Sequence, residues 1–479
     1  MSLFDKYTAI VDRIETIRYI GRIERVQGLL IESAGPQAVV GELCQIELTE
    51  GGPMVWGEVV GLRGRTVQIM PFTDISGVQV GSRVIASGST LQVPVGPNLL
   101  GRVLGPLGKP IDQRGDVGAS ELYPVIADPP PPLERRPIRE QLVTGIRSID
   151  GLVATGKGQR LGVFSGSGIG KSTLIGMVAR NTKADVNVIA LIGERGREVG
   201  EFLENDLGEE GLARSVVVVS TSDTPPLARL RGAFVATAIA EYFRDQGNDV
   251  MLLFDSVTRF ARAQREIGLA TGEAPATRGF PPSVFSILPR LLERSGTAAK
   301  GSITGFYSIL VEGDDMDEPV SDTVRGILDG HVVLSRRLAQ RYHYPPIDVL
   351  DSVSRLAIKV TSPELQRAAG YIRRLMATYA EAEDLINVGA YAKGSNAEID
   401  EAISKMPAIN QFLCQAIEER APIEDVRAQL LSIAGMVPTA PAPAAEETAP
   451  RDQDEVAGVR SLLSRQNEES QQSEEVDDA

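Results

Sequence analysis

A glycine-rich segment that ends in Lys-Ser lies between an apolar run and a helix-like segment. It reads Ser165, Gly166, Ser167, Gly168, Ile169, Gly170, Lys171, Ser172 and Thr173. Glycines at this spacing let backbone N–H groups turn inward around phosphate oxygens, and the start of the following helix adds positive partial charge. We expect Lys171 to reach the β- and γ-phosphates of a nucleotide and Ser172 to give its hydroxyl to Mg²⁺. The strict Walker A pattern begins with glycine, and Ser165 departs from it.

Two carboxylates follow apolar runs at positions where a phosphate-binding loop needs acidic groups. Asp255 ends the run 250–254, which is the Walker B arrangement of a carboxylate aimed at the water shell of Mg²⁺. Glu194 follows the run 186–192, and a carboxylate there can orient and polarise an attacking water. The alternative for Glu194 is a loop residue paired with a neighbouring arginine.

Phosphoryl transfer also needs positive charge near the γ-phosphate, and two arginines are candidates. Arg259 lies one helical turn after Asp255, which favours a contact within the same subunit. Arg355 comes well after the predicted sheet and could reach a neighbouring subunit's nucleotide, as an arginine finger does. For either arginine the alternative is a surface or packing role.

The elements that would hold these residues change in character along the chain. Residues 2–20 have apolar side chains at helical spacing and predict an amphipathic helix, which either packs on the next domain or docks to a partner helix. Residues 21–95 contain short strands between turn signals and predict a small β-barrel. From about 140 to 345, apolar strands alternate with helices, which is typical of a mostly parallel sheet buried on both faces. Amphipathic helices are predicted from Ser362 to about Met436.

Composition limits the classes of protein that these elements can form. The chain has 479 residues, which is too long for one ordinary core, and its formal net charge of −15 disfavours sequence-independent nucleic-acid binding. Two cysteines and two histidines predict neither a disulfide framework nor a cysteine- or histidine-based metal site. No apolar run approaches membrane-spanning length, and the N-terminus lacks the layout of a signal peptide. We therefore expect a cytoplasmic protein without a nucleic-acid partner.

The segment 438–479 differs from the rest of the chain. It opens with Pro-Thr-Ala-Pro-Ala-Pro and contains eleven acidic and three basic residues, so it carries −8 of the −15. This composition cannot support a core and predicts a disordered acidic tail.

Together the motifs resemble the catalytic subunit of rotary ATP synthases and, more closely, type III protein-export ATPases. The motifs shared with rotary enzymes are 144–150, the glycine-rich loop, Gly193-Glu194-Arg195 and 255–259. The export-type signatures are 259–273, 311–316 and 343–350. The resemblance covers roughly residues 20–437, and the segment 322–331 looks more like flagellar than injectisome ATPases.

The resemblance implies an α/β fold with an N-terminal β-barrel, a RecA-like P-loop ATPase core and a C-terminal helical domain. The expected ranges are 1–20 for the amphipathic helix, 21–95 for the barrel, 96–345 for the ATPase core, 346–437 for the helical domain and 438–479 for the tail. It also implies an ATP-hydrolysing homohexamer, peripheral at the inner face of the cytoplasmic membrane and next to the export gate. Implied partners are a regulator dimer on the N-terminal helix, a coiled-coil stalk protein in the pore, and export chaperone–substrate complexes.

Carried over residue by residue, the resemblance also implies roles within the site. Lys171 and Ser172 hold phosphate and Mg²⁺, Glu194 is the catalytic carboxylate, Arg259 contacts the γ-phosphate of its own subunit, and Arg355 is the arginine finger. Tyr344 matches the aromatic residue that stacks on adenine. The second adenine-side aromatic of the synthase pattern is Ile417 here, which leaves the selectivity for adenine open.

Several other functions are compatible with part of this pattern. The nearest alternatives are an injectisome ATPase and a rotary synthase subunit, and the export-type residues after Arg259 count against the synthase. An RNA-tracking hexameric helicase shares the plan of barrel and ATPase core, but the N-terminal domain has Trp56 as its only tryptophan and no basic aromatic strand to stack bases. A nucleotide-binding structural subunit without turnover is a further possibility, against which the intact Lys171, Glu194 and Asp255 argue.

Overall fold

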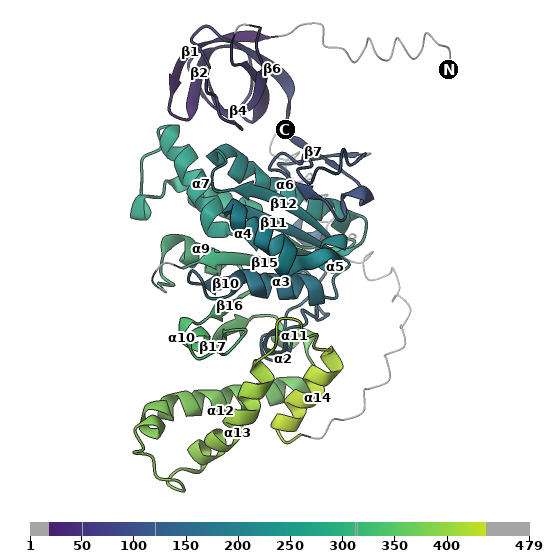
Figure 1. Ribbon diagram of the computed structural model, residues 1–479, viewed down its shortest axis with the longest axis vertical. Helices are drawn as coiled ribbons and strands as arrows, with labels where there is room; N and C mark the ends of the chain where they lie inside the picture. Colours follow the sequence, from purple (N-terminus) through teal and green to yellow (C-terminus); the bar gives the residue numbers. More distant parts are fainter. Residues whose placement is uncertain (1–18, 50, 120, 312, 314, 437–479) are drawn as a thin grey trace, which may run out of the picture. The chain divides into compact units, whose positions relative to one another are not determined.

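The computed structural model describes residues 19–436 except positions 50, 120, 312 and 314 (Figure 1). The helix predicted for residues 2–20 lies outside the described residues apart from its last two, and Ile20 begins a strand. The predicted acidic tail, 438–479, also lies outside them.

The first strands of the chain close into a barrel. They are β1 (Ile20–Gln27), β2 (Leu30–Ala34), β3 (Glu42–Glu47), β4 (Met54–Arg63), β5 (Thr66–Pro71) and β6 (Arg83–Thr90). They hydrogen-bond in the order β1-β2-β5-β4-β3-β6, and β6 pairs with β1 to close the ring. Inward-pointing side chains such as Ile31, Ile46 and Ile69 are fully buried, as the period of two along a strand requires. The predicted small β-barrel is confirmed.

Short elements connect the barrel to the core. They are β7 (Gln92–Val95), η1 (Pro97–Leu99), β8 (Val103–Leu104), β9 (Glu121–Pro124) and η2 (Pro132–Glu134). Strands β7 and β9 pair antiparallel with each other.

An ion pair also joins the barrel to the core. Arg231 of helix α6 (Pro226–Asp245) contacts both carboxylate oxygens of Glu58 in β4, with 2.7 Å between Nε and Oε2.

The central sheet follows the order β17-β16-β10-β15-β13-β11-β12-β8, with β14 paired to β15. The strands after β8 are β10 (Arg160–Ser165), β11 (Val186–Glu194), β12 (Ser215–Thr221), β13 (Asp249–Asp255), β14 (Gly296–Thr297), β15 (Ser302–Leu310), β16 (Gly330–Leu334) and β17 (Ile347–Ser354). All pairings along this order are parallel except that of β17 with β16. The mostly parallel sheet predicted from the apolar runs is therefore confirmed.

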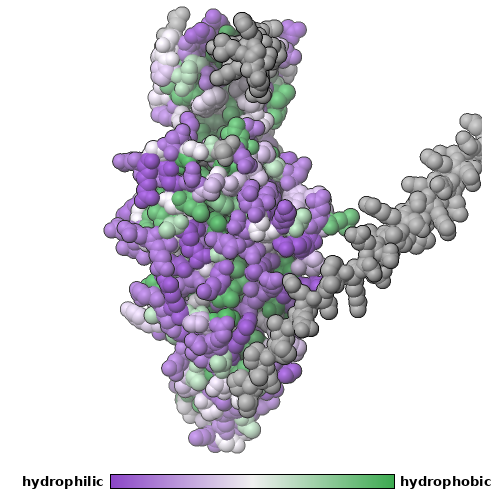
Figure 2. All heavy atoms as spheres, turned by 90° about the vertical axis from the view of Figure 1, so that its right-hand side faces the viewer, coloured by the Kyte–Doolittle hydropathy of each residue, from purple (hydrophilic) through white to green (hydrophobic). Residues whose placement is uncertain are grey.

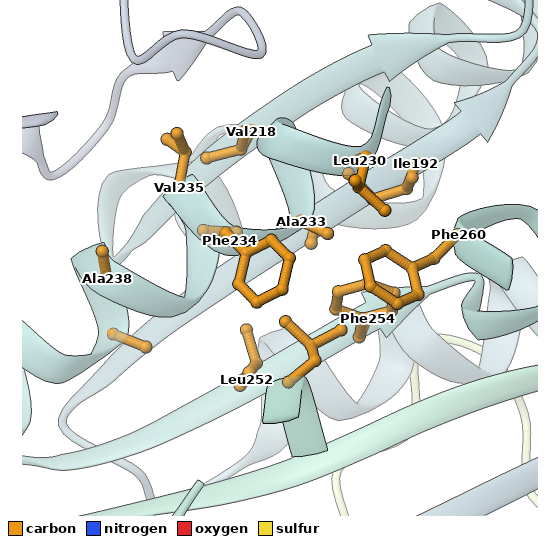
Figure 3. Packing of buried hydrophobic residues seen from close by; sticks show 14 of the residues in the cluster. Ile192, Val218, Leu230, Ala233, Phe234, Val235, Ala238, Leu252, Phe254 and Phe260 are labelled. Carbon is orange, nitrogen blue, oxygen red and sulfur yellow. The ribbon is translucent and has the colours of Figure 1, made fainter. Parts of the chain in front are cut away.

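Both faces of the sheet are covered by helices. Every residue of β11 is buried, and its side chains alternate between two cores: Val188 packs with α6 and α7 (Val257–Ala270), whereas Ile189 packs with α3 (Lys171–Asn181). Figure 3 shows the first core, where Phe234 of α6 faces Phe260 of α7 with ring centroids 5.8 Å apart. Burying a side chain of this size stabilises the fold by about 1.5–3 kcal/mol, so these contacts fix the strand ends that carry the site.

Shorter helices complete the ATPase core. They are α2 (Arg147–Leu152), α4 (Gly196–Glu201), η3 (Phe202–Leu207), α5 (Gly208–Ala213), η4 (Thr277–Gly279), α8 (Pro282–Leu292), α9 (Pro319–Ile327) and α10 (Arg336–Gln340). Element η3 is a π-helix between two α-helical segments.

The C-terminal part of the described chain is helical. It contains α11 (Ala357–Val360), α12 (Pro363–Asn387), α13 (Ala397–Leu413) and α14 (Ile423–Ile433). The predicted cap is present, since the Ser362 hydroxyl accepts a hydrogen bond from the Leu365 N–H at the start of α12. Phe412 packs so tightly on α2 that a Cβ on Gly151 would lie 2.9 Å from its ring. The predicted helical domain is confirmed.

On the face drawn in Figure 2, hydrophilic residues cover much of the described surface, and hydrophobic residues lie between them. In the part of the chain that the structure describes, no helix is both long and apolar enough to cross a membrane.

Candidate active site

The glycine-rich loop joins the end of β10 to the start of α3, at the carboxyl edge of the parallel strands. Gly168 and Gly170 have φ values of 75° and 91°, a backbone conformation that favours glycine. Ser165 is instead the last residue of the extended strand and pairs with Leu310, so its position does not need glycine. This explains why the chain tolerates serine at the first position of the Walker A pattern.

The loop residues differ in accessibility. Ser167, Gly168 and Ser172 are exposed, whereas the loop residues Gly166 and Ile169 are buried. Lys171 is buried, and its Nζ lies 2.5 Å from Oδ1 of Asp255 and 3.6 Å from Oε1 of Glu194. The structure therefore brings together the three charged groups that the sequence pattern predicted for one site.

Glu194 and Asp255 end neighbouring strands, because β11 and β13 pair in parallel. Asp255 also accepts a hydrogen bond from the Ser308 hydroxyl at 2.7 Å, from the adjacent strand β15. Sequence reasoning missed Ser308, since a serine inside an otherwise apolar strand gives no signal until the register places it beside Asp255. The hydrogen bond fixes the orientation of the Asp255 carboxylate.

Arg259 lies against Glu194, as its position one turn after Asp255 suggested. Its Nη1 is 2.9 Å from Glu194 Oε2 and also donates to the Gly193 carbonyl. The Arg259 side chain crosses directly over Gly193, where a Cβ would lie 2.9 Å from Arg259 Cδ. Glycine at this position, with φ of 76°, therefore lets Arg259 reach the carboxylate.

The electrostatics of Glu194 suit a proton acceptor. Burial and the neighbouring Asp255 raise the pKa of Glu194 to about 7, and the charges of Lys171 and Arg259 oppose that rise. Its Oε1 is buried and accepts no hydrogen bond. A carboxylate whose buried oxygen accepts no hydrogen bond, next to a phosphate-binding loop, can take a proton from a water molecule held there.

The hydroxyl and carboxylate at the loop fit Mg²⁺. Ser172 begins α3 beside Lys171 and is exposed, and Asp255 lies at the carboxyl edge of the sheet within reach of Lys171. Hard oxygen ligands of this kind suit Mg²⁺, which usually takes few protein ligands and completes its shell with water and phosphate oxygens.

Tyr344 lies beside the loop, as expected of an adenine-stacking residue. A Cβ on Gly170 would lie 3.8 Å from the Tyr344 ring, and the ring remains 44% exposed. The chain segment that holds Ile417 is tied to it, since Gln415 N–H donates to the Tyr344 carbonyl at 2.9 Å. Ile417 is also 44% exposed.

Arg355 lies at the opposite edge of the sheet from the loop. The prediction that it comes well after the sheet is wrong, because Arg355 directly follows β17, a strand of the same sheet that runs antiparallel to β16. The N–H of Arg355 donates to the carbonyl of Asp329, next to the first residue of β10. The six residues of β10 separate this edge from the loop by about 20 Å at roughly 3.3 Å per residue. Arg355 is exposed there and cannot reach the phosphate loop of its own subunit.

Three family models match consecutive parts of the chain. The ATP synthase alpha/beta family β-barrel domain matches residues 23–88, and the nucleotide-binding domain of the same family matches 145–354. The T3SS EscN ATPase C-terminal domain matches 361–432.

Known relatives match over most of their length. The flagellum-specific ATP synthase of Treponema pallidum (strain Nichols) is 58% identical over 434 residues, which covers 91% of this chain and 97% of the relative. That of Bacillus subtilis (strain 168) is 52% identical, covering 90% and 99%. The type 3 secretion system ATPase of Xanthomonas euvesicatoria is 50% identical, covering 87% and 94%.

A solved structure of the assembled ATPase EscN from the enteropathogenic E. coli type III secretion system has a TM-score of 0.82 and 43% identity, covering 86% of this chain and 100% of EscN. EscN in complex with its central stalk EscO gives a TM-score of 0.80. Flagellum-specific ATP synthases and type 3 secretion ATPases thus both match the chain at high identity over most of its length, and the EscN structure shares its fold. The chain belongs to the ATP synthase alpha/beta family, within the group formed by flagellum-specific ATP synthases and type III secretion ATPases.

Proposed function

We propose that this chain hydrolyses Mg²⁺-ATP as the homohexameric motor subunit of a flagellar type III protein-export apparatus. The carrying observation is the cluster of Lys171, Glu194 and Asp255 at the end of the glycine-rich loop. The flagellar assignment is supported by relatives named flagellum-specific ATP synthase at 58% and 52% identity. The injectisome ATPases at similar identity are the alternative.

The residues divide the work of hydrolysis. The backbone from Gly166 to Thr173 holds the phosphates, Lys171 neutralises the β- and γ-phosphates, and Ser172 and Asp255 position the metal ion with its water shell. Bound Mg²⁺ supplies positive charge to the phosphate oxygens. Glu194 takes a proton from the attacking water, Arg259 stabilises charge on the γ-phosphate in its own subunit, and Tyr344 stacks on adenine.

Nucleotide binding must rearrange the cations of this site. Lys171 contacts Asp255, and Arg259 contacts Glu194, so both cations are paired with carboxylates of the site. An incoming triphosphate competes for them with the negative charge of its β- and γ-phosphate groups. When Arg259 moves to the γ-phosphate, Glu194 has one positive neighbour fewer, and loss of that charge raises the pKa of Glu194.

The proposed organisation follows the relatives. The proposed ranges are 1–20 for the partner-binding helix, 21–95 for the barrel, 96–345 for the ATPase core, 346–437 for the helical domain and 438–479 for the tail. Two of these bounds shift in the structure, because Ile20 begins β1 of the barrel and β17 belongs to the sheet of the ATPase core. A ring with a coiled-coil stalk in its pore is supported by the solved complex of EscN with its central stalk EscO. A regulator dimer, export chaperone–substrate complexes and the export gate complete the proposed partners, at the cytoplasmic face of the inner membrane.

Two experiments test this function. Purified protein should release phosphate from Mg²⁺-ATP, and the chain isolated from its own cells should bring flagellar export components with it. Isolation with injectisome components instead would change the assignment to secretion, and a folded protein without turnover would leave only a structural nucleotide-binding role.

Changing Glu194 to Gln should separate nucleotide binding from chemistry. The amide keeps the size of the side chain but cannot accept a proton, so turnover should fall at least ~100-fold, the scale of losing a positioned base. Affinity for Mg²⁺-ATP should stay close to that of the wild type, measured by titration with a fluorescent ATP analogue. Parallel loss of binding and turnover would show that Glu194 is structural.

Deleting residues 2–18 should spare basal hydrolysis and abolish binding of the regulator. The apolar side chains of the predicted helix are remote in sequence from Lys171 and have no role in the chemistry of its site. Phosphate release and co-purification with the regulator measure the two properties. If the truncated protein unfolds, the helix packs on its own domain.

A further inference from the structure

One face of helix α3 is covered by the π-helical element η3. Thr173, Gly176 and Arg180 are three and four residues apart, so they line one face of α3. Asp206, near the end of η3, contacts this face at its centre. A Cβ on Gly176 would lie 2.7 Å from the Asp206 Cβ and 2.8 Å from the Asp206 carbonyl oxygen, so only glycine allows this approach.

Asp206 also interacts with the residues on either side of Gly176. The Asp206 carboxylate interacts with the Thr173 hydroxyl on one side of Gly176, and the positive charge of Arg180 acts on it from the other end of the helix face. Burial raises the pKa of Asp206, and these two partners oppose that rise. A half-buried carboxylate thus depends on a residue of the phosphate loop and on an arginine.

Arg180 extends this arrangement to the adenine side of the site. Its Nη2 donates to the Ile417 carbonyl at 2.9 Å. The segment containing Ile417 also holds Gln415, whose N–H donates to the Tyr344 carbonyl. Asp206 therefore lies between a residue of the phosphate loop and the arginine that anchors the adenine-side segment.

The backbone of η3 is suited to such a contact. A π-helix has hydrogen bonds from residue i to i+5, is rare, and occurs frequently at functional sites. Here it spans Phe202–Leu207, directly after the helix that follows Glu194, and Gly208 ends it with φ of 64°. Asp206 comes from this segment and not from the regular helices on either side.

We propose that Asp206 is a positioning residue for nucleotide binding, which holds Thr173 of the phosphate loop and, through Arg180, the segment of Ile417 at the adenine end. This inference rests on the proposed nucleotide site but assigns Asp206 no chemical step. Its loss should therefore weaken binding of the nucleotide and leave the chemistry of the bound nucleotide almost unchanged.

Asp206→Ala tests the proposal through the separation of KM and kcat. We expect affinity for a fluorescent ATP analogue to fall about tenfold, the scale of losing one hydrogen bond to a charged group, with KM rising in parallel. The kcat at saturating ATP should change less than about twofold. Asp206→Asn should lie between Ala and the wild type, because its amide oxygen still accepts from Thr173 but carries no charge for Arg180.

Matched variants separate positioning from general stability. Gly176→Ala pushes Asp206 away and should reproduce the loss of affinity, whereas Gly200→Ala on nearby α4, where a Cβ meets no atom within 4 Å, should not. Glu204→Gln removes a charge from an exposed position of the same π-helix and should also bind as the wild type. Melting temperatures should be recorded for all variants.

Two results overturn the proposal. One is wild-type affinity in Asp206→Ala and Gly176→Ala, and the other is a loss of kcat equal to the loss of affinity, which marks a general structural defect. If Asp206→Ala does not fold, Asp206→Asn decides by the same measurements. Absence of nucleotide binding by the wild type would instead reject the proposed site itself.

Discussion

Lys171→Ala should remove ATP hydrolysis. Lys171 is buried at the start of α3, its Nζ reaches both Asp255 and Glu194, and it is the cation that the loop itself offers to the β- and γ-phosphates. The change also acts on the base. Without the positive charge of Lys171, which lowers the pKa of Glu194, that pKa rises further, and less of the carboxylate is ionised at neutral pH. Phosphate release should fall below detection.

The control for this variant lies just outside the same helix. Lys183 is exposed just beyond the end of α3, and Lys183→Ala removes the same charge and side-chain length from outside the site. It should hydrolyse ATP as the wild type does. Circular dichroism and melting temperature check that Lys171→Ala is folded, since it leaves Asp255 and Glu194 without their shared cation. Full turnover by a folded Lys171→Ala protein would rule out this site.

Features that are marked by the residues directly next to them in the sequence could be predicted. The glycine-rich loop, Asp255 and Glu194 each follow an apolar run, and apolar runs buried on both faces give strands whose carboxyl ends meet at one edge. This is why the charges of the site could be expected to converge before the structure was known. The barrel could be predicted for a similar reason, since short alternating strands with frequent turns close most readily on themselves.

Features that depend on register could not be predicted. Ser308 reaches Asp255 only because β15 pairs with β13, and the sequence of β15 gives no sign of it. The packing of Arg259 over Gly193 and of Asp206 against Gly176 depends on how two segments approach, which periodicity does not describe. Strand β17 was likewise not anticipated, although it determines on which edge of the sheet Arg355 lies.

Arg355→Ala should reduce turnover roughly 10³–10⁵-fold, the range known for arginine fingers. Arg355 is exposed at the edge of the sheet opposite to the phosphate loop, about 20 Å away by the length of β10. We therefore expect it to act on the nucleotide of another subunit. Lys359→Ala removes an exposed cation one turn later and should cost far less. Specific activity of the wild type should rise with protein concentration as rings form.

Mixing two inactive variants tests directly whether Arg355 acts in trans. Monomers of Arg355→Ala and Lys171→Ala, combined before assembly, form rings in which some intact phosphate loops face an intact Arg355, so part of the activity should return. If mixed rings form but stay inactive, either Arg355 acts within its own subunit or turnover needs several intact sites in sequence. Titration of wild type into Arg355→Ala separates these cases. A strongly curved loss of activity indicates sequential firing. A linear loss shows that the sites fire independently, and inactive mixed rings then refute the trans assignment.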